Sequence, residues 1–210
     1  MLERIGPREQ KDLLIAWIAI TLAFTLIFVR SGTSPLMFLV FFAISALTVG
    51  VGFILHELAH KFTAMRYGYW AEFRKDNQML LVAVLLAALV GVVFAAPGAT
   101  VIYGSYLSRE QNGRISAAGP LTNLLLCIPF FGLTSLGGIP GLAGMIGFSV
   151  NAMIAAFNML PVGVLDGKKI LAWNPGVFAL MITVSFAAVV LALSGFSLGD
   201  LLTSSFPSAI

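Results

Sequence analysis

Apolar runs dominate the chain and alternate with short polar segments. Six runs approach the roughly 20 apolar residues that a helix needs to cross about 30 Å of hydrocarbon. They cover residues 13–29, 35–64, 79–96, 116–138, 141–159 and 177–195. The pattern predicts an all-α polytopic membrane protein with about five to six transmembrane helices.

The composition narrows the class of protein. Hydrophobic residues make up 59% of the 210 residues, charged residues make up 10%, and the mean hydropathy is +0.99. An average soluble domain is about 45–50% apolar and about 25% charged, so a cytosolic globular enzyme and a disordered chain are both excluded. The twelve Lys and Arg residues lie in small groups between apolar runs, which is typical of membrane topology rather than of nucleic-acid binding. We expect a single membrane-embedded domain over residues 1–210.

Ionisable groups inside apolar runs are the informative polar positions. Such a group costs at least ~2.5–3.5 kcal/mol at the centre of a spanning helix, and it therefore indicates function. His56, Glu57 and His60 interrupt the second run and include both histidines of the chain. Residues four apart share a helix face, so the two imidazoles can hold one metal ion. The carboxylate of Glu57 can then reach a water on that ion rather than the ion itself.

A catalytic zinc ion needs a third protein ligand and one open position. The chain has no third histidine. Asp166, which follows the fifth run, is the leading candidate, although an Asp-Gly pair is also a common turn signal. Cys127 is the competing ligand, but it lies in a leucine-rich run, where a cysteine behaves as a small buried hydrophobe.

Three motifs resemble those of the site-2 protease family of intramembrane zinc metalloproteases. The first is the H-E-x-x-H sequence of residues 56–60. The second, over residues 158–167, fits the family's N-x-x-P-x-x-x-L-D-G pattern at every fixed position. The third, over residues 118–123, is similar to the family's A-G-P-x-x-N stretch. The three motifs occur in the family's order and span more than half of the chain.

The resemblance implies a function and assigns roles to residues. It implies a protease that hydrolyses peptide bonds within or near transmembrane segments of substrate proteins. The chain departs from the family pattern in that no PDZ-like domain interrupts it, so we expect a compact form without a PDZ domain. His56, His60 and Asp166 would bind one Zn²⁺ per chain, and Glu57 would be the general base. The catalytic core would cover about residues 36–170. The expected substrate-binding residues are Asn158 and Asn123, although each also fits a helix–helix hydrogen bond, and for Asn123 we favour that structural role.

A zinc ion shared by His60 and Asp166 constrains the topology, because both residues must lie at one depth. His60 lies in the second half of run two, and Asp166 lies just past the end of run five. Both ligands are therefore near the exit side of their runs, so the two runs must cross in the same direction. We therefore expect a short re-entrant or β element between the second helix and the A-G-P-containing helix, so that the region 79–113 begins and ends on one side. The resemblance implies a membrane-associated β element in this region, and residues 99–103, which follow the Pro97-Gly98 break, are the candidate. The positive-inside rule agrees with this return, because only Arg30 of the basic residues then falls outside. The active site would face the cytoplasmic side of the cell membrane.

Two other functions fit part of the pattern. A membrane metal transporter also places His and Asp inside the membrane, but we expect it to have ligands on several helices and a second site, whereas this chain has one cluster. A catalytically inactive metal-binding membrane protein is the other alternative, and the presence of Glu57 argues against it. The expected partners are transmembrane protein substrates and the lipid bilayer, with no nucleic acid; the sequence does not predict the oligomeric state.

Overall fold

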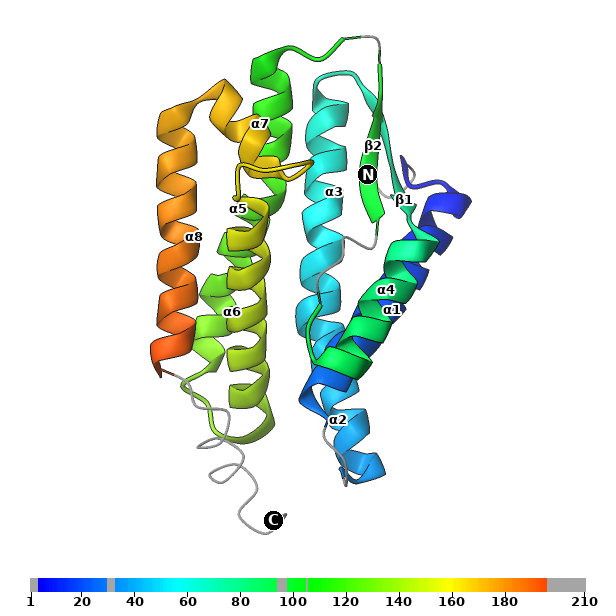
Figure 1. Ribbon diagram of the computed structural model, residues 1–210, viewed down its shortest axis with the longest axis vertical. Helices are drawn as coiled ribbons and strands as arrows, with labels where there is room; N and C mark the ends of the chain where they lie inside the picture. Colours follow the sequence, from blue (N-terminus) through cyan, green and yellow to red (C-terminus); the bar gives the residue numbers. More distant parts are fainter. Residues whose placement is uncertain (1–3, 30–32, 94–97, 105, 196–210) are drawn as a thin grey trace. The chain divides into compact units, whose positions relative to one another are not determined.

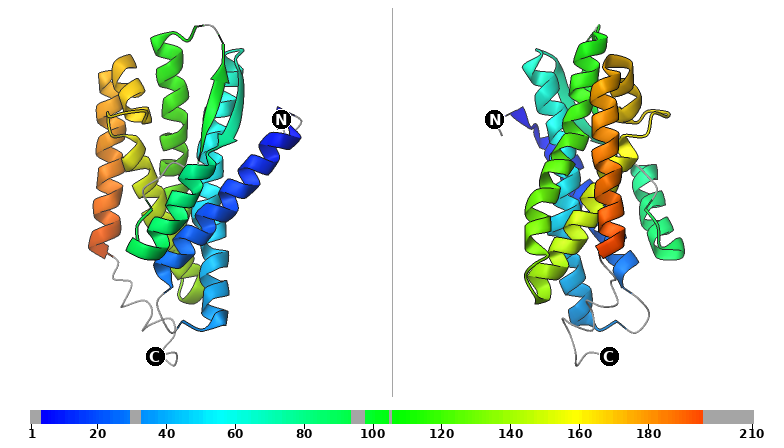
Figure 2. Two further views of the ribbon diagram at one scale, coloured as in Figure 1. Left: turned by 45° about the vertical axis from the view of Figure 1, so that its right-hand side comes forward. Right: turned by 90° about the vertical axis from the view of Figure 1, so that its left-hand side faces the viewer.

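The computed structural model describes residues 4–29, 33–93, 98–104 and 106–195. The chain divides into two compact units, Met1–Tyr106 and Leu107–Ile210. Helices dominate both units (Figure 1, Figure 2). In this described part, five helical segments are long and apolar enough to cross a membrane: Pro7–Phe28, Pro35–Arg66, Arg109–Leu133, Gly138–Asn158 and Pro175–Gly195. The chain is therefore a multi-pass membrane protein, and the predicted helical fold class is confirmed.

The first unit is built on α1 (Pro7–Phe28) and a second, longer helical segment. The longer segment consists of α2 (Pro35–Ser45), the π-helix η2 (Ala46–Gly50) and α3 (Val51–Arg66). Both α1 and α2 start with a proline, which suits the first helical position because its backbone nitrogen needs no partner there. Along its length α1 packs against α2, η2 and the smaller elements of this unit.

The π-helix η2 lies directly before the helix that carries the H-E-x-x-H motif. Single π-turns inside α-helices are rare and are frequent at functional sites. Trp17 of α1 donates its indole N–H to the Ala46 carbonyl at 3.1 Å. The indole can approach this closely because residue 50 is glycine: a Cβ on Gly50 would lie 2.5 Å from Trp17 Nε1. The wide turn is therefore held against α1, and α3 continues from it as a regular helix.

A two-stranded antiparallel sheet lies beside α3 in the same unit (Figure 1). Its strands are β1 (Trp70–Lys75) and β2 (Gly98–Tyr103), paired from Trp70↔Tyr103 to Lys75↔Gly98. The strand predicted over residues 99–103 is thus confirmed, whereas β1 was not predicted.

The helix α4 (Asn77–Val90) connects the two strands. It is 14 residues long, so it extends about 21 Å and is shorter than the roughly 30 Å of hydrocarbon. The chain leaves the sheet at Lys75 and rejoins it at Gly98, the residue paired with Lys75. The segment between these two residues therefore begins and ends at one place, while the prediction that the region 79–113 begins and ends on one side of the membrane stays a prediction. Positions 94–96, the end of the predicted apolar run, lie outside the described residues.

The second unit consists of four helices: α5 (Arg109–Leu133), α6 (Gly138–Asn158), α7 (Asp166–Trp173) and α8 (Pro175–Gly195). The helix α6 packs against α5 and α8, and the short α7 packs against the same two helices. The start of α5 differs from the prediction, which began this helix at residue 116. Ser108 and Gln111 form a reciprocal capping box that starts the helix earlier, and Pro120 lies inside the helix without ending it.

Candidate metal centre

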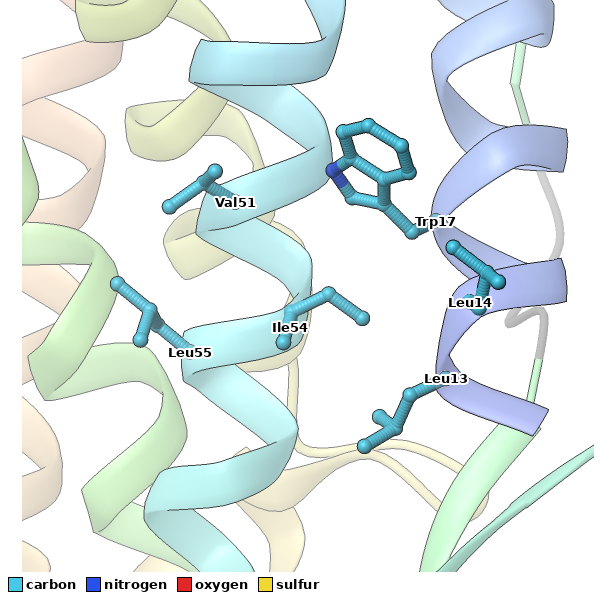
Figure 3. Close-up of a pocket in the computed structure, with 6 residues that line it drawn as sticks. All are labelled: Leu13, Leu14, Trp17, Val51, Ile54 and Leu55. Atoms are coloured by element: carbon cyan, nitrogen blue, oxygen red, sulfur yellow. The ribbon is translucent and has the colours of Figure 1, made fainter. Parts of the chain in front are cut away.

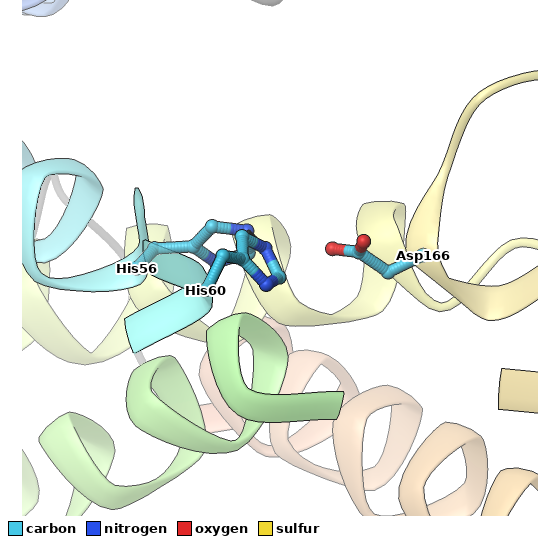
Figure 4. A group of neighbouring side chains, drawn as sticks. All are labelled: His56, His60 and Asp166. Carbon is cyan, nitrogen blue, oxygen red and sulfur yellow. Dashed lines mark hydrogen bonds between the residues drawn. The ribbon is translucent and has the colours of Figure 1, made fainter. Parts of the chain in front are cut away.

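His56 and His60 lie one turn apart on α3, and both side chains are buried. Figure 4 draws them together with Asp166, the third predicted ligand. The two Nε2 atoms lie 3.0 Å apart, and the ring centroids are 4.7 Å apart. Two nitrogens bound at 2.0–2.1 Å to one tetrahedral zinc ion lie roughly 3.3 Å apart. The histidine pair therefore has nearly the spacing that a shared metal ion requires.

Glu57 is buried on the same helix and contacts β2. Its Oε2 atom accepts the backbone N–H of Thr100 at 2.9 Å, and the Thr100 hydroxyl lies 2.9 Å from the same oxygen. That hydroxyl is also 3.0 Å from the Glu57 carbonyl oxygen, so its single proton serves one acceptor at a time. Strand β2 therefore fixes the direction in which the Glu57 carboxylate points.

A buried ion pair fastens α3 to α1 and β1. Lys61, next to His60, lies 2.5 Å from Oε2 of Glu9, and the two side chains are 0% and 1% exposed. The other carboxylate oxygen of Glu9 accepts the backbone N–H of Phe73 at 2.9 Å. The Lys61 ammonium also lies 5.5 Å from the centre of the Trp70 ring, within cation–π range. One carboxylate of α1 thus connects the motif-bearing helix to the sheet.

Asp166 is the first residue of α7 in the second unit, and it is buried. A negative charge is favourable at this end of a helix, and Lys169, one turn later, lies 3.7 Å from Asp166 Oδ1. The next residue must be small, because a Cβ on Gly167 would lie 2.1 Å from the Met159 carbonyl oxygen. The Asp-Gly sequence therefore starts a helix rather than a simple turn, and its carboxylate oxygens are of the type that binds zinc.

The two predicted substrate-binding asparagines lie in different surroundings. Asn123 of α5 is fully buried and donates to the side-chain oxygen of Asn151 on α6 at 2.8 Å. That contact fits the helix–helix role that we favoured for Asn123. Asn158, at the end of α6, is only partly buried and donates to the Ile154 carbonyl of its own helix at 3.0 Å.

Cys127, the competing ligand, belongs to the apolar core of the second unit. It packs with Phe148, Ala152 and Ala192, and its sulfur lies 3.7 Å from the Phe148 carbonyl oxygen. These neighbours are the surroundings of a structural cysteine.

A pocket of about 280 Å³ lies between α1 and α3 in the first unit (Figure 3). Its lining side chains are all apolar apart from the indole nitrogen of Trp17, which is already bonded to Ala46. They are Leu13, Leu14, Trp17, Val51, Ile54 and Leu55. Because this lining offers no titratable group, we assign no chemistry to the pocket.

Glu9, Lys61 and Thr100 were not predicted as members of this region. Lys61 carried a usable signal, because it is a charge inside the apolar run 35–64 and so requires a partner. Glu9 and Thr100 carried none, since each finds its partner only through tertiary contacts between elements far apart in the sequence.

Comparison with known proteins identifies the chain. "Putative zinc metalloprotease MJ0611" of Methanocaldococcus jannaschii is 41% identical over 181 residues, which cover 85% of this chain and 91% of that protein. The chain belongs to the site-2 protease family of zinc metalloproteases. "Putative zinc metalloprotease YwhC" of Bacillus subtilis is 28% identical to this family member over 64% of the chain and 71% of the relative. "Putative zinc metalloprotease Rip2" of Mycolicibacterium smegmatis is 33% identical over 54% of the chain and 50% of the relative.

No family model and no solved structure matches the chain. The names of the relatives support a metalloprotease function for this site-2 protease family member, and they imply zinc as its metal. The histidine pair on α3 fits such an ion, as its spacing indicates.

Proposed function

We propose that this protein is an intramembrane zinc metalloprotease that hydrolyses peptide bonds within or near the transmembrane segments of other proteins. The observation that carries the proposal is the H-E-x-x-H motif on a buried stretch of a membrane-spanning helix. His56, Glu57 and His60 all lie in the segment Pro35–Arg66. Hydrolytic groups at that position suit a substrate that is itself in the membrane.

His56, His60 and Asp166 are the proposed ligands of one zinc ion per chain. The spacing of the two histidine nitrogens and the match of residues 158–167 to the family pattern support this set. When bound, zinc would lower the pKa of a coordinated water to about 7 and polarise the scissile carbonyl. Two imidazoles and one carboxylate leave the fourth position that such catalysis needs.

Glu57 is the proposed general base. Its carboxylate takes a proton from the attacking water and delivers it to the leaving amine. It can do so without being a ligand, because residues one apart on a helix point in different directions. The hydrogen bonds from Thr100 support this role, since a base must be held in one orientation to act efficiently.

The outer edge of β2 is the proposed platform for the substrate. Phe73 and Thr100 are partners in register, yet the N–H of Phe73 points to Glu9 and that of Thr100 to Glu57. They therefore form a non-hydrogen-bonded pair, and alternate residues of β2, namely Gly98, Thr100 and Ile102, direct their backbone polar groups away from β1. Glu57 accepts the N–H of Thr100, so an unwound substrate segment would add to this edge as a strand beside Glu57, through the outward groups of Gly98 and Ile102.

Unwinding is required because the carbonyls of a transmembrane helix are engaged in hydrogen bonds within that helix. Asn158, which is only partly buried, is the proposed further contact to the substrate backbone. The proposed location is the cell membrane with the active site toward the cytoplasmic side, on the basis of the distribution of Lys and Arg between the spans. The proposed partners are transmembrane protein substrates and the lipid bilayer.

Metal content and proteolysis, measured on the same purified samples, test the proposal. Glu57→Gln should keep metal near one ion per chain and abolish cleavage of single-span test proteins. His60→Ala should lose metal and cleavage together, and Asp166→Ala should resemble it. Glu110→Gln, at a carboxylate that is 60% exposed, is the matched control and should behave as the native chain.

The same samples separate a protease from a metal transporter. A transporter would cut no test protein in any version, and Glu57→Gln would alter metal flux instead. Cleavage by Glu57→Gln at the native rate would show that the general-base assignment is wrong.

A further inference from the structure

We infer that Thr100 is a positioning residue for the general base: its backbone N–H and its hydroxyl hold the Glu57 carboxylate against the edge of β2. The inference deepens the proposed function and rests on it for the role of Glu57. The contact itself stands on geometry alone, because three distances of 2.9, 2.9 and 3.0 Å join these two residues.

The direction of the Thr100 amide makes this contact specific. In an antiparallel pair, successive residues of a strand direct their N–H groups alternately toward and away from the partner strand. The N–H of Thr100 points away from β1, so the N–H of its neighbour Val101 points toward Glu72, its partner in register. The Glu57 carboxylate therefore occupies a position on the β2 edge where another strand would otherwise bond.

The backbone N–H and the hydroxyl of Thr100 both contact the same carboxylate oxygen, Oε2. This arrangement restricts rotation of the carboxylate about its last side-chain bond and gives the second oxygen one fixed direction. Because β2 is also the proposed substrate platform, one strand sets the position of the base and of the peptide to be cut. A misplaced base lowers the rate of the chemical step more than it lowers substrate binding.

Position 100 also offers well-matched substitutions. Thr100→Val keeps the shape and the backbone N–H but removes the hydroxyl, and Thr100→Ser keeps both donors. Thr25→Val is the control, because Thr25 is a buried threonine whose hydroxyl donates to the Thr21 carbonyl at 2.7 Å within α1. A general effect of losing a buried hydroxyl would appear at both positions.

The first arm of the test measures amide hydrogen exchange by NMR on the metal-free protein in detergent micelles, and needs no activity. Glu57→Ala removes the acceptor, so the Thr100 amide should exchange about tenfold faster or more, the size expected for a hydrogen bond to a charged group. The Val101 amide in the same sample should be unchanged. Equal acceleration at both amides, or none at Thr100, would overturn the inference.

The second arm measures cleavage kinetics of the metal-loaded protein. Thr100→Val should lower kcat by about tenfold with KM and metal content unchanged, while Thr100→Ser and Thr25→Val should remain near native. A native kcat in Thr100→Val, a loss that Thr100→Ser does not restore, or an equal loss in Thr25→Val would overturn the positioning role. If the native chain cuts no substrate, the proposed function fails, and the exchange arm alone still decides whether Thr100 holds Glu57.

Discussion

Replacing Lys61 by methionine should destabilise the protein strongly, because it leaves a buried carboxylate without its cation. The two side chains of the Lys61–Glu9 pair are 0% and 1% exposed, so water cannot solvate the carboxylate that remains. Breaking such a pair from one side costs about 3–5 kcal/mol. The Phe73 N–H still donates to Glu9, which favours the lower part of that range. A loss of about 3 kcal/mol is roughly a 150-fold change in the ratio of folded to unfolded protein.

The measurement is equilibrium unfolding of the metal-free protein, followed by tryptophan fluorescence as dodecyl sulfate is titrated into mild-detergent micelles. Metal is omitted because a ligand that binds only the folded state adds its own stabilisation. Glu110→Gln is the control. Glu110 pairs with Arg114, and the two side chains are 60% and 52% exposed, respectively. Exposed ion pairs contribute about 0–1 kcal/mol to stability.

A double variant tests the reason for the loss. Glu9→Gln with Lys61→Met removes both charges and keeps an oxygen that can accept the Phe73 N–H. It should be more stable than Lys61→Met alone, because no uncompensated charge stays buried. The reasoning is refuted if Lys61→Met is as stable as Glu110→Gln, or if the double variant is less stable than the single one.

Three further predictions concern the second unit and the topology. Gly167→Ala should lower metal content in folded protein, since its Cβ would lie 2.1 Å from the Met159 carbonyl oxygen; Gly132→Ala, which meets nothing within 4 Å, should bind metal normally. Asn123→Leu should lower the free energy of unfolding by about 0.6–1.7 kcal/mol and leave kcat unchanged, whereas a lower kcat at native stability would assign Asn123 to the substrate. Reporter tags inserted at Gly68, after α3, and at Asn174, after α7, should both lie in the cytoplasm. Tags found on opposite sides of the membrane would contradict the shared depth of the proposed ligands.

The sequence predicted the membrane helices well, because the thickness of the hydrocarbon core sets the length of the apolar run that a spanning helix needs. The strand β2 was also predicted, from the family resemblance together with the Pro97-Gly98 break that precedes it. The hydropathy pattern missed β1, because the stretch Trp70–Lys75 mixes three apolar residues with three charged ones and becomes a strand by pairing with β2. It placed the start of α5 too late, since hydropathy does not detect a helix that begins in polar residues with a capping box.

Three of the proposed site residues followed from helical spacing, whereas Asp166 as the third ligand and the two asparagines rested on the family resemblance. His56, Glu57 and His60 are close in sequence, so the helical period alone brings the two histidines together. The environment of Glu57 could not be predicted, because Thr100 reaches it through a sheet that forms between distant segments. The same is true of Glu9, which is 52 residues from Lys61 and looks like an ordinary surface charge in the sequence.

The π-turn at Ala46–Gly50 behaves as a one-residue insertion that the helix has absorbed. Each residue of an α-helix advances the direction of the side chains by about 100°. Because its turn is wider, five residues of π-helix turn through about the same angle as four residues of α-helix. Deleting one residue from this turn would therefore restore regular α-helix and leave Glu57 facing β2, with His56 and His60 in nearly the same direction as before. The π-turn thus takes up one residue without rotating the motif, so homologous chains that are one residue shorter at this point can keep the motif in the same orientation.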